Sequence, residues 1–309
     1  MADVSIGGRL DFGMKNSKST DAAGVVTKTN SLAGNDHGAT TSRLTFKGNE
    51  DLGGGLKAGF EITTMIDPNA TTTGDTIFNR SREAYVTVGG DFGTVKLGTF
   101  TNLFDGFVDQ GWHNDTGMSA TKYFPTRTNN AIAYVAPTMS GFTGGIALVN
   151  DKTTVDGATT AKTAGNLLFG SYAIDALSLE AGYGSIKTSD TMKKTQLGIK
   201  VGYDLGVAKL QYMYADGEQN DAGAKAGRKD NVISAAMPFG AVTVSAAYGN
   251  YKGNGADAGI KTTGYHLSAD YSFSKRTSAY FTTGQKKEKT DGAQSGKTTT
   301  TSIGLIHKF

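Results

Sequence analysis

The 309-residue sequence predicts an all-β fold, a transmembrane barrel of about sixteen antiparallel strands. Apolar and polar side chains alternate along most of the chain, and no comparable helical stripe is found. Tight turns and long polar connections also alternate, as in a barrel with short periplasmic turns and long extracellular loops. Glycine is abundant at 43 residues and proline is rare at 4, a composition that suits twisted strands better than helices.

Each expected strand has one apolar face. Such faces are formed by Val4, Ile6, Leu10 and Phe12, by Leu197, Ile199, Val201 and Tyr203, and by Tyr265, Leu267, Ala269, Tyr271 and Phe273. Short connections are expected at 49–55, 89–93, 174–177, 204–206, 238–241 and 273–276, and long ones at 15–38, 66–77, 102–128, 152–164, 218–229, 252–260 and 286–297. Sixteen strands leave about 19 residues for a strand with its connection, enough to cross a bilayer at a tilt. One barrel domain over residues 1–309 is therefore expected.

A soluble β-sandwich also alternates apolar and polar residues, with the apolar face inside. The barrel is favoured because the strands are long and similar in length, because the polar face carries charges deep within strands, such as Glu61, Lys96 and Lys200, and because Tyr or Phe recurs near strand ends. A soluble binding or adhesion module remains the alternative from a different class. Extraction in plain buffer would favour it.

Composition excludes several classes of protein. The chain has no cysteine, so disulfides and thiolate metal sites are ruled out. The mean hydropathy is -0.31 and no run of about 18 apolar residues occurs, which excludes a transmembrane helix. The net charge of +3 is spread out, so no nucleic-acid partner is expected. The opening MADVSIGG has no leader character, so a membrane protein would have lost its signal peptide.

No catalytic constellation is found in the sequence. The four histidines, at 37, 113, 266 and 307, have no ligand spacing, and no Gly-x-Ser-x-Gly elbow stands beside a plausible base. GNEDLGGG lacks the lysine and helix of a phosphate-binding loop and is expected to be a turn. We therefore expect no enzyme activity, no metal and no cofactor.

Several segments resemble the general porins of Gram-negative outer membranes, most closely the neisserial and β-proteobacterial type. They are RLTFKGNEDLGGGLKAGFEI (43–62), FNRSREAYVTVGGDFGTVKLG (78–98), DYSFSKRTSAY (270–280) and the closing GLIHKF. The resemblance implies a homotrimer of sixteen-stranded barrels in the bacterial outer membrane. It further implies that the third long loop folds into each barrel and forms an eyelet through which ions and small hydrophilic solutes diffuse. The implied partners are those solutes, outer-membrane lipids, lipopolysaccharide and the barrel assembly machinery.

The segment 101–129 follows the fifth strand, where the resemblance places the inserted loop. It carries Asp105, Asp109 and Asp115, which are expected to form the acidic side of the eyelet. A solvated surface loop is the plainer alternative for these carboxylates.

The resemblance also implies a basic wall opposite this loop. Arg43 occupies the family position in SRLTFKG and lies on the same face of its strand as Lys47, so both side chains should point inward. The alternation along the first strand predicts that Arg9 also points inward. Arg127 lies at the exit of the long loop, where the family has another pore arginine. Lys96 and Arg82 are weaker candidates. Arg82 shares parity with the lipid-facing Ala84, so it reaches the lumen only through a bulge or beyond the hydrocarbon band.

One family position differs in this chain. Thr99 stands where the family commonly has an arginine after GTVKLG, which should widen the eyelet or weaken its preference for anions. Acidic side chains on the loop and basic side chains on the facing wall would create an electric field across the pore. Salt would screen this field only in part, because the fixed charges lie within a Debye length of about 8 Å across a narrow opening. We expect passive diffusion with weak selectivity, for anions. A solute-specific channel with a saturable site is the alternative among channels.

The chain ends on SIGLIHKF, in which Ile303, Leu305, His307 and Phe309 share one face. In a closed barrel the last strand pairs with the first, so this segment should lie beside ADVSIGGRL. The resemblance implies that Phe309 is also part of the assembly signal.

Overall fold

A computed structural model describes residues 3–34, 40–67, 78–102, 125–155 and 158–309. The strands are β1 (Asp3–Asp21), β2 (Val26–Gly34), β3 (Arg43–Gly53), β4 (Leu56–Ile66), β5 (Phe78–Gly90), β6 (Gly93–Thr101), β7 (Arg127–Val135), β8 (Phe142–Val155), β9 (Ala158–Ile174), β10 (Leu177–Lys187), β11 (Met192–Asp204), β12 (Lys209–Asp221), β13 (Ala224–Phe239), β14 (Val242–Gly255), β15 (Ile260–Ser272), β16 (Thr277–Thr290) and β17 (Ala293–Lys308). No helix among these residues is long and apolar enough to cross a bilayer.

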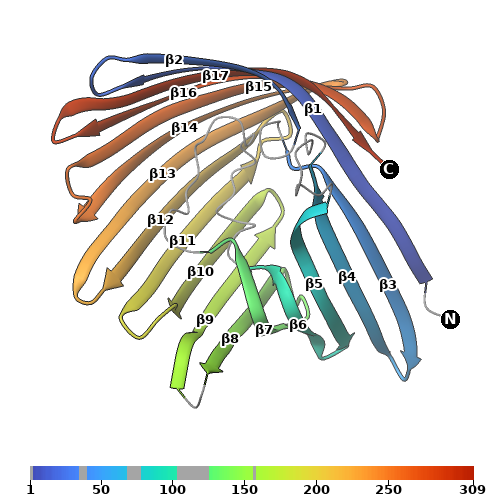
Figure 1. The fold of residues 1–309 in the computed structure, drawn as a ribbon. Helices are drawn as coiled ribbons and strands as arrows, with labels where there is room; N and C mark the ends of the chain where they lie inside the picture. Colours follow the sequence, from blue (N-terminus) through green and yellow to red (C-terminus); the bar gives the residue numbers. More distant parts are fainter. Residues whose placement is uncertain (1–2, 35–39, 68–77, 103–124, 156–157) are drawn as a thin grey trace.

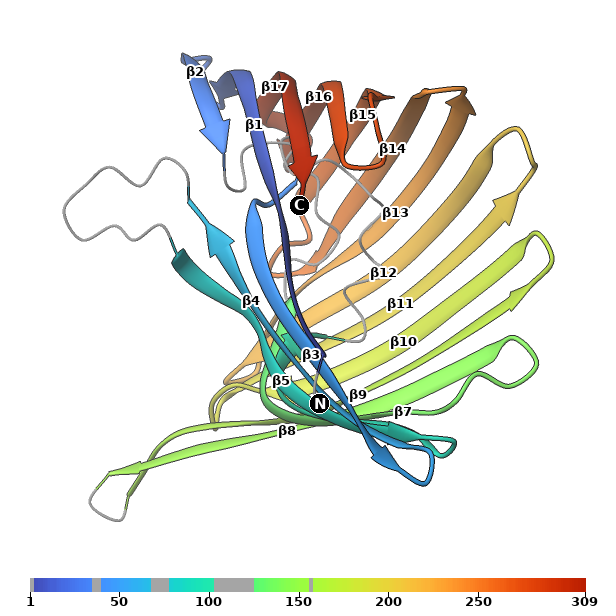
Figure 2. The same cartoon turned by 90° about the vertical axis from the view of Figure 1, so that its right-hand side faces the viewer.

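The sheet closes into a barrel because the first strand pairs with the last. β1 pairs with β17 from Arg9 opposite Lys308 to Asp21 opposite Gly296. Its other edge pairs with β3 over the first half and with β2 over the second, so β2 and β3 share one position in the wall. The result is the predicted closed 16-stranded antiparallel barrel. Figures 1 and 2 show the wall curving from β3 through β10 to β17 and back to β1.

The barrel is apolar on its outer face. Ile62, Val86 and Ile303 point outward and are 51%, 53% and 59% exposed, whereas the inward-pointing Gln196 and Asp230 are each 1% exposed. A soluble sandwich would bury the first set and expose the second. The soluble alternative is therefore wrong, and the outer face is suited to lipid.

Part of the inner wall is apolar as well, which the sequence did not indicate. Inward positions from β6 to β14 form one buried cluster: Phe100, Ala131, Ala133, Ala147, Val149, Leu167, Ile186, Met213, Val232 and Tyr251. From β6 to β14 the lumen face therefore mixes apolar side chains with polar and charged ones such as Gln196 and Asp230.

Several connections expected as long loops are continuous hairpins. β12 and β13 leave only Ala222 and Gly223 in their turn, and β16 and β17 leave only Asp291 and Gly292. These residues have φ of 48°, 93°, 51° and 85°, the left-handed values that tight two-residue hairpin turns require. The segments 218–229 and 286–297 are thus strand ends, where polar side chains occupy both faces and erase the alternation.

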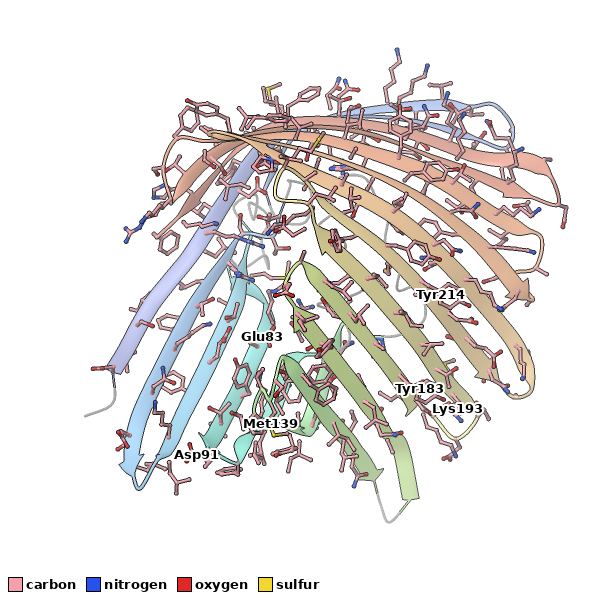
Figure 3. The ribbon with its side chains drawn as sticks, turned by 180° about the vertical axis from the view of Figure 1, so that it is seen from behind. Glu83, Asp91, Met139, Tyr183, Lys193 and Tyr214 are labelled. Carbon is pink, nitrogen blue, oxygen red and sulfur yellow. The ribbon has the colours of Figure 1, made fainter. Side chains whose placement is uncertain are left out.

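Figure 3 shows side chains on both faces of this sheet. Lys193 lies near the tip of the β10–β11 hairpin, while Asp91 and Met139 lie at short turns. The two ends of the barrel therefore differ, with hairpin extensions at one and compact turns at the other.

Candidate functional site

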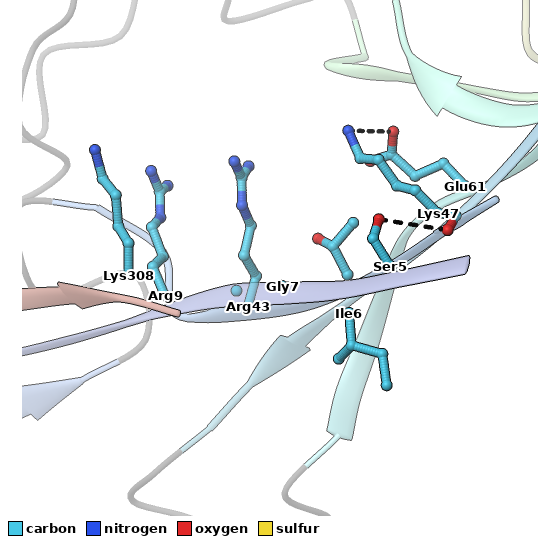
Figure 4. Close-up of a pocket in the computed structure, with 10 residues that line it drawn as sticks. Ser5, Ile6, Gly7, Arg9, Arg43, Lys47, Glu61 and Lys308 are labelled. Atoms are coloured by element: carbon cyan, nitrogen blue, oxygen red, sulfur yellow. Dashed lines mark hydrogen bonds and ion pairs between the residues drawn. The ribbon is translucent and has the colours of Figure 1, made fainter. Parts of the chain in front are cut away.

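Three cations lie side by side on the inner wall, across the seam where the barrel closes. Lys308 of β17 is directly opposite Arg9 of β1, and Arg9 is directly opposite Arg43 of β3. Residues directly opposite each other in a sheet point to the same face, with Cβ atoms about 5 Å apart. Figure 4 shows the three side chains pointing to one side, while Ile6 points to the other. We call Lys308, Arg9 and Arg43 the cationic row.

Arg9 is the central member of the row and is held by the backbone. Its Nε donates to the Thr41 carbonyl oxygen at 2.8 Å. It is repelled by Arg43 and Arg82 and attracted by Asp11. Asp11 is fully buried and accepts a hydrogen bond from the Tyr280 hydroxyl at 2.9 Å. Its negative charge is therefore stabilised partly by a donor other than Arg9. The row keeps a surplus of positive charge.

A β-bulge in β5 interrupts simple alternation at Arg82. Thr63 of β4 is opposite Glu83, but Thr64 is opposite Ser81, so Arg82 is the extra residue. A bulge of this kind changes the direction of one side chain. The electrostatic interaction of Arg82 with Arg9 agrees with an inward position, which simple alternation assigned to the lipid face.

Lys47 points inward as expected, but its charge is neutralised. Its Nζ lies 3.1 Å from Glu61 Oε2, and the ion pair is visible in Figure 4. Glu61 also accepts hydrogen bonds from the Tyr85 hydroxyl at 2.7 Å and from the Thr63 hydroxyl at 2.9 Å. These contacts make Lys47 part of a neutral network.

Lys96 belongs to the same sector of the wall. Its Nζ lies 4.0 Å from the centroid of the Tyr85 ring and 5.2 Å from that of Phe100, both within the range of cation–π attraction. The carboxylates of Glu61 and Glu83 also attract it. Lys96 therefore lies against two aromatic rings, and nearby carboxylates offset part of its charge.

A pocket of about 410 Å³ opens between the cationic row and the Lys47–Glu61 pair. Its lining includes Ser5, Thr45 and the backbone of Gly7 and Gly8. The pocket thus has a strongly cationic end and a nearly neutral end.

The remaining predicted wall positions lie elsewhere. Arg127 is opposite Thr101 at the start of β7, and its Nε is buried. Thr99 is opposite Ala84, an outward residue, beside a bulge that follows Gly98. The acids Asp105, Asp109 and Asp115 fall outside the described residues, so the acidic side of the eyelet stays a prediction.

Lys308 was missed as a member of the wall. The sequence does give its inward parity and its place on the strand that must pair with the first. What alternation alone does not give is the register, which sets it opposite Arg9.

Phe309 closes the seam at the end of this row. Its carbonyl accepts from Gly8 N at 2.9 Å, and its own N donates to the Gly8 carbonyl at 3.1 Å. A side chain on Gly8 would stand 2.6 Å from Phe309 Cζ, so glycine lets the terminal ring pack against β1. The predicted pairing of the first and last strands is confirmed, but the register differs: SIGLIHKF lies opposite Gly8–Lys15 and meets only the end of ADVSIGGRL.

Comparison with known proteins agrees with this architecture. The chain matches the family described as Gram-negative porin over residues 1–291. It is similar to the outer membrane porin protein 32 of Delftia acidovorans, with 29% identity over 88% of this chain and 86% of that protein. The major outer membrane protein P.IB of Neisseria meningitidis serogroup B is 26% identical over 100% of this chain and 95% of its own. Among solved structures, the anion-selective porin from Comamonas acidovorans has a TM-score of 0.77 and 25% identity, and both chains are covered completely.

Proposed function

The chain belongs to the Gram-negative porin family and forms a channel in the bacterial outer membrane, and we propose that this channel favours anions because of the cationic row. Three adjacent strands each place a cation at the same level of the lumen, and none of their directly opposed residues is an acid. This observation carries the proposal.

The electrostatic argument depends on spacing. Neighbouring members of the row have Cβ atoms about 5 Å apart, a spacing shorter than the Debye length of about 8 Å, so their potentials add at physiological salt. The low-dielectric wall strengthens that field in the lumen. A related porin from Comamonas acidovorans is described as anion-selective, which supports the same sign here.

The other parts of the proposal concern the surroundings of the row. Arg82 and Arg127 add positive charge, Lys47 and Lys96 contribute less because of their partners, and Asp105, Asp109 and Asp115 oppose them from the inserted loop. The channel performs no covalent chemistry, and residues 1–309 act as one barrel unit within a homotrimer. Small hydrophilic solutes pass by diffusion, and Phe309 takes part in recognition by the assembly machinery.

Reversal potentials in a planar bilayer under a KCl gradient test the sign of selectivity. We expect a value displaced toward the chloride equilibrium potential, with closure in three steps. A strong preference for potassium would contradict the proposal. Current that saturates or is blocked by a divalent anion at low concentration would favour the solute-specific alternative, because the cationic row could then hold an ion.

A further inference from the structure

The lumen face carries the sequence Arg-x-Asp at two places, and the two arginines have different partners. In β13, Arg228 and Asp230 form an ion pair, with Nε 2.6 Å from Oδ1 and Nη2 donating to Oδ2 at 3.0 Å. In β1, Arg9 instead donates to the Thr41 carbonyl, and within the described part of the chain it makes no ion pair with Asp11. Alternation places both residues of each motif on the lumen face, so strand geometry alone does not explain the difference.

Electrostatic forces alone would draw Arg9 to Asp11. Arg43 and Arg82 repel Arg9, whereas Asp11 attracts it. Residues i and i+2 of a strand lie about 7 Å apart on one face. The ion pair in β13 shows that an arginine spans this separation. Arg9 could therefore fold back onto Asp11, and other contacts in the seam must prevent it.

Neutral donors occupy the carboxylate of Asp11. Its Oδ2 accepts a hydrogen bond from the Thr40 backbone N at 2.5 Å and another from the Thr40 hydroxyl at 3.2 Å. Its Oδ1 accepts from the Tyr280 hydroxyl at 2.9 Å, and the whole side chain is buried. A carboxylate has about four acceptor positions, so these three hydrogen bonds leave little capacity for a guanidinium.

Tyr280 reaches Asp11 across two glycines. It lies on β16 opposite Gly304 of β17, which in turn is opposite Gly13 of β1. A Cβ atom on either glycine would collide with the Tyr280 hydroxyl, so the missing side chains let the ring lie across both strands. The two glycines therefore allow Tyr280 to take the place at Asp11 that Arg9 would otherwise take.

The ion pair in β13 also has a tyrosine nearby, but in a different position. Tyr251 is directly opposite Asp230, and the Arg228 guanidinium lies over its ring, 4.5 Å from the centroid. Among the described residues, the Tyr251 hydroxyl has no hydrogen-bond partner, so it does not compete for the carboxylate. The position of the tyrosine thus distinguishes the two motifs.

The segment from Thr40 to Ser42 also keeps the acid and the arginine apart. Thr40 supplies two donors to Asp11, whereas the Thr41 carbonyl accepts from Arg9 Nε at 2.8 Å. The Ser42 hydroxyl accepts from the Asp11 backbone N at 2.9 Å, which fixes the segment against β1. Three consecutive residues therefore hold each member of the motif at its own site.

We propose that Tyr280 and Thr40 are positioning residues for ion selectivity: by occupying Asp11, they keep the Arg9 guanidinium in the cationic row. Without these donors, Arg9 would fold back onto Asp11, as the arginine of β13 does onto its own acid. The middle position of the cationic row would then be neutralised. The inference rests on the proposed anion preference and adds the residues that maintain it.

Reversal potentials of the folded trimer in a KCl gradient test this inference. Tyr280→Phe removes one donor at constant charge, so its potential should shift from the wild-type value toward the potassium equilibrium potential. The shift should have the direction of that in Arg9→Gln and be smaller, because the charge is moved and not removed. Thr40→Val removes only the hydroxyl donor and should shift the potential the same way by less. Tyr248→Phe, on the exposed outer face, is the matched control and should not shift it.

A second substitution separates repositioning of Arg9 from a loosened seam. Adding Asp11→Asn to Tyr280→Phe removes the carboxylate that would capture Arg9, so the double variant should return to the wild-type potential or pass it toward chloride. Adding Tyr280→Phe to Arg9→Gln should change nothing further, because no guanidinium is left to move. Such non-additivity is expected of residues in one network. The same cycle with Thr40→Val serves if Tyr280→Phe yields no trimer.

Three results would overturn the inference: unchanged potentials in both Tyr280→Phe and Thr40→Val, a shift that Asp11→Asn does not reverse, or a full shift in the Arg9→Gln background. The channel proposal fails separately, since a wild type that prefers potassium refutes it whatever the variants show. A wild type that prefers chloride, with variants that do not shift, refutes the inference alone.

Discussion

Arg82 illustrates what a single residue adds to the pattern of its strand. Strict alternation assigns it to lipid, but the bulge in β5 makes it the unpaired residue beside Glu83 and brings it within electrostatic range of Arg9. Arg9 and Arg43, by contrast, follow simple parity and could be predicted from the sequence. A bulge depends on the partner strand's register, which a single sequence does not encode locally.

The absence of cysteine allows a direct test of this placement. Arg82→Cys should react with a charged, water-soluble thiol reagent and show a stepwise fall in single-channel conductance, because the thiol faces the lumen. Ala84→Cys, on the outer face of the same strand, should not react in a bilayer. The reverse pattern would place Arg82 in lipid.

Tyr280 joins the seam strands by a buried contact. Its hydroxyl donates to Asp11 at 2.9 Å, and its ring packs against Gly13 and Gly304 on the two adjoining strands. Tyr280→Phe leaves the buried carboxylate short of a donor, which should cost about 1–3 kcal/mol of unfolding free energy. Denaturant unfolding followed by gel mobility measures the change. Tyr248→Phe, on the exposed outer face, is the control and should unfold like the wild type.

At the scale of elements, the strands in the bilayer were predictable and the strand ends beyond it were not. Within the bilayer one face must be apolar, so β11 and β15 show their alternation in the sequence. Beyond it both faces meet polar surroundings, and the ends of β12, β13, β16 and β17 look like loops. The register that pairs Lys308 with Arg9 likewise depends on closure of the whole sheet.

The two kinds of connection predict the orientation of the barrel. An epitope inserted between Ala222 and Gly223, at the tip of β12–β13, should be labelled by antibody on intact cells. The same epitope inserted in the turn at Gly53–Gly55 should be labelled only after the outer membrane is permeabilised. Labelling of the second site on intact cells would invert the proposed orientation.

For the whole molecule, closure depends on the pairing of the two chain ends. Phe309 exchanges two backbone hydrogen bonds with Gly8, and its exposed ring lies beside Gly8 on the face of the sheet opposite to the cationic row. This contact therefore ends the ladder between β1 and β17 without lining the lumen.

Removal of Phe309 should impair assembly more than conductance. We expect the deletion to lower the amount of folded trimer in the outer membrane several-fold, while the channels that do form keep the single-channel conductance of the wild type. Phe273→Ala, which removes an exposed aromatic ring at the short-turn end, is the control and should change the yield less. Normal yield with altered conductance would contradict this separation of roles.

The central claim is that the cationic row sets the ion preference of the channel. Its most direct test is the reversal potential of Arg9→Gln, Arg43→Gln, Lys308→Gln beside the wild type and the charge-balanced control Lys47→Gln, Glu61→Gln. The account predicts that the wild type and the control prefer chloride and that the triple variant loses most of this preference. A wild type that prefers potassium, or a triple variant with unchanged selectivity, would contradict it.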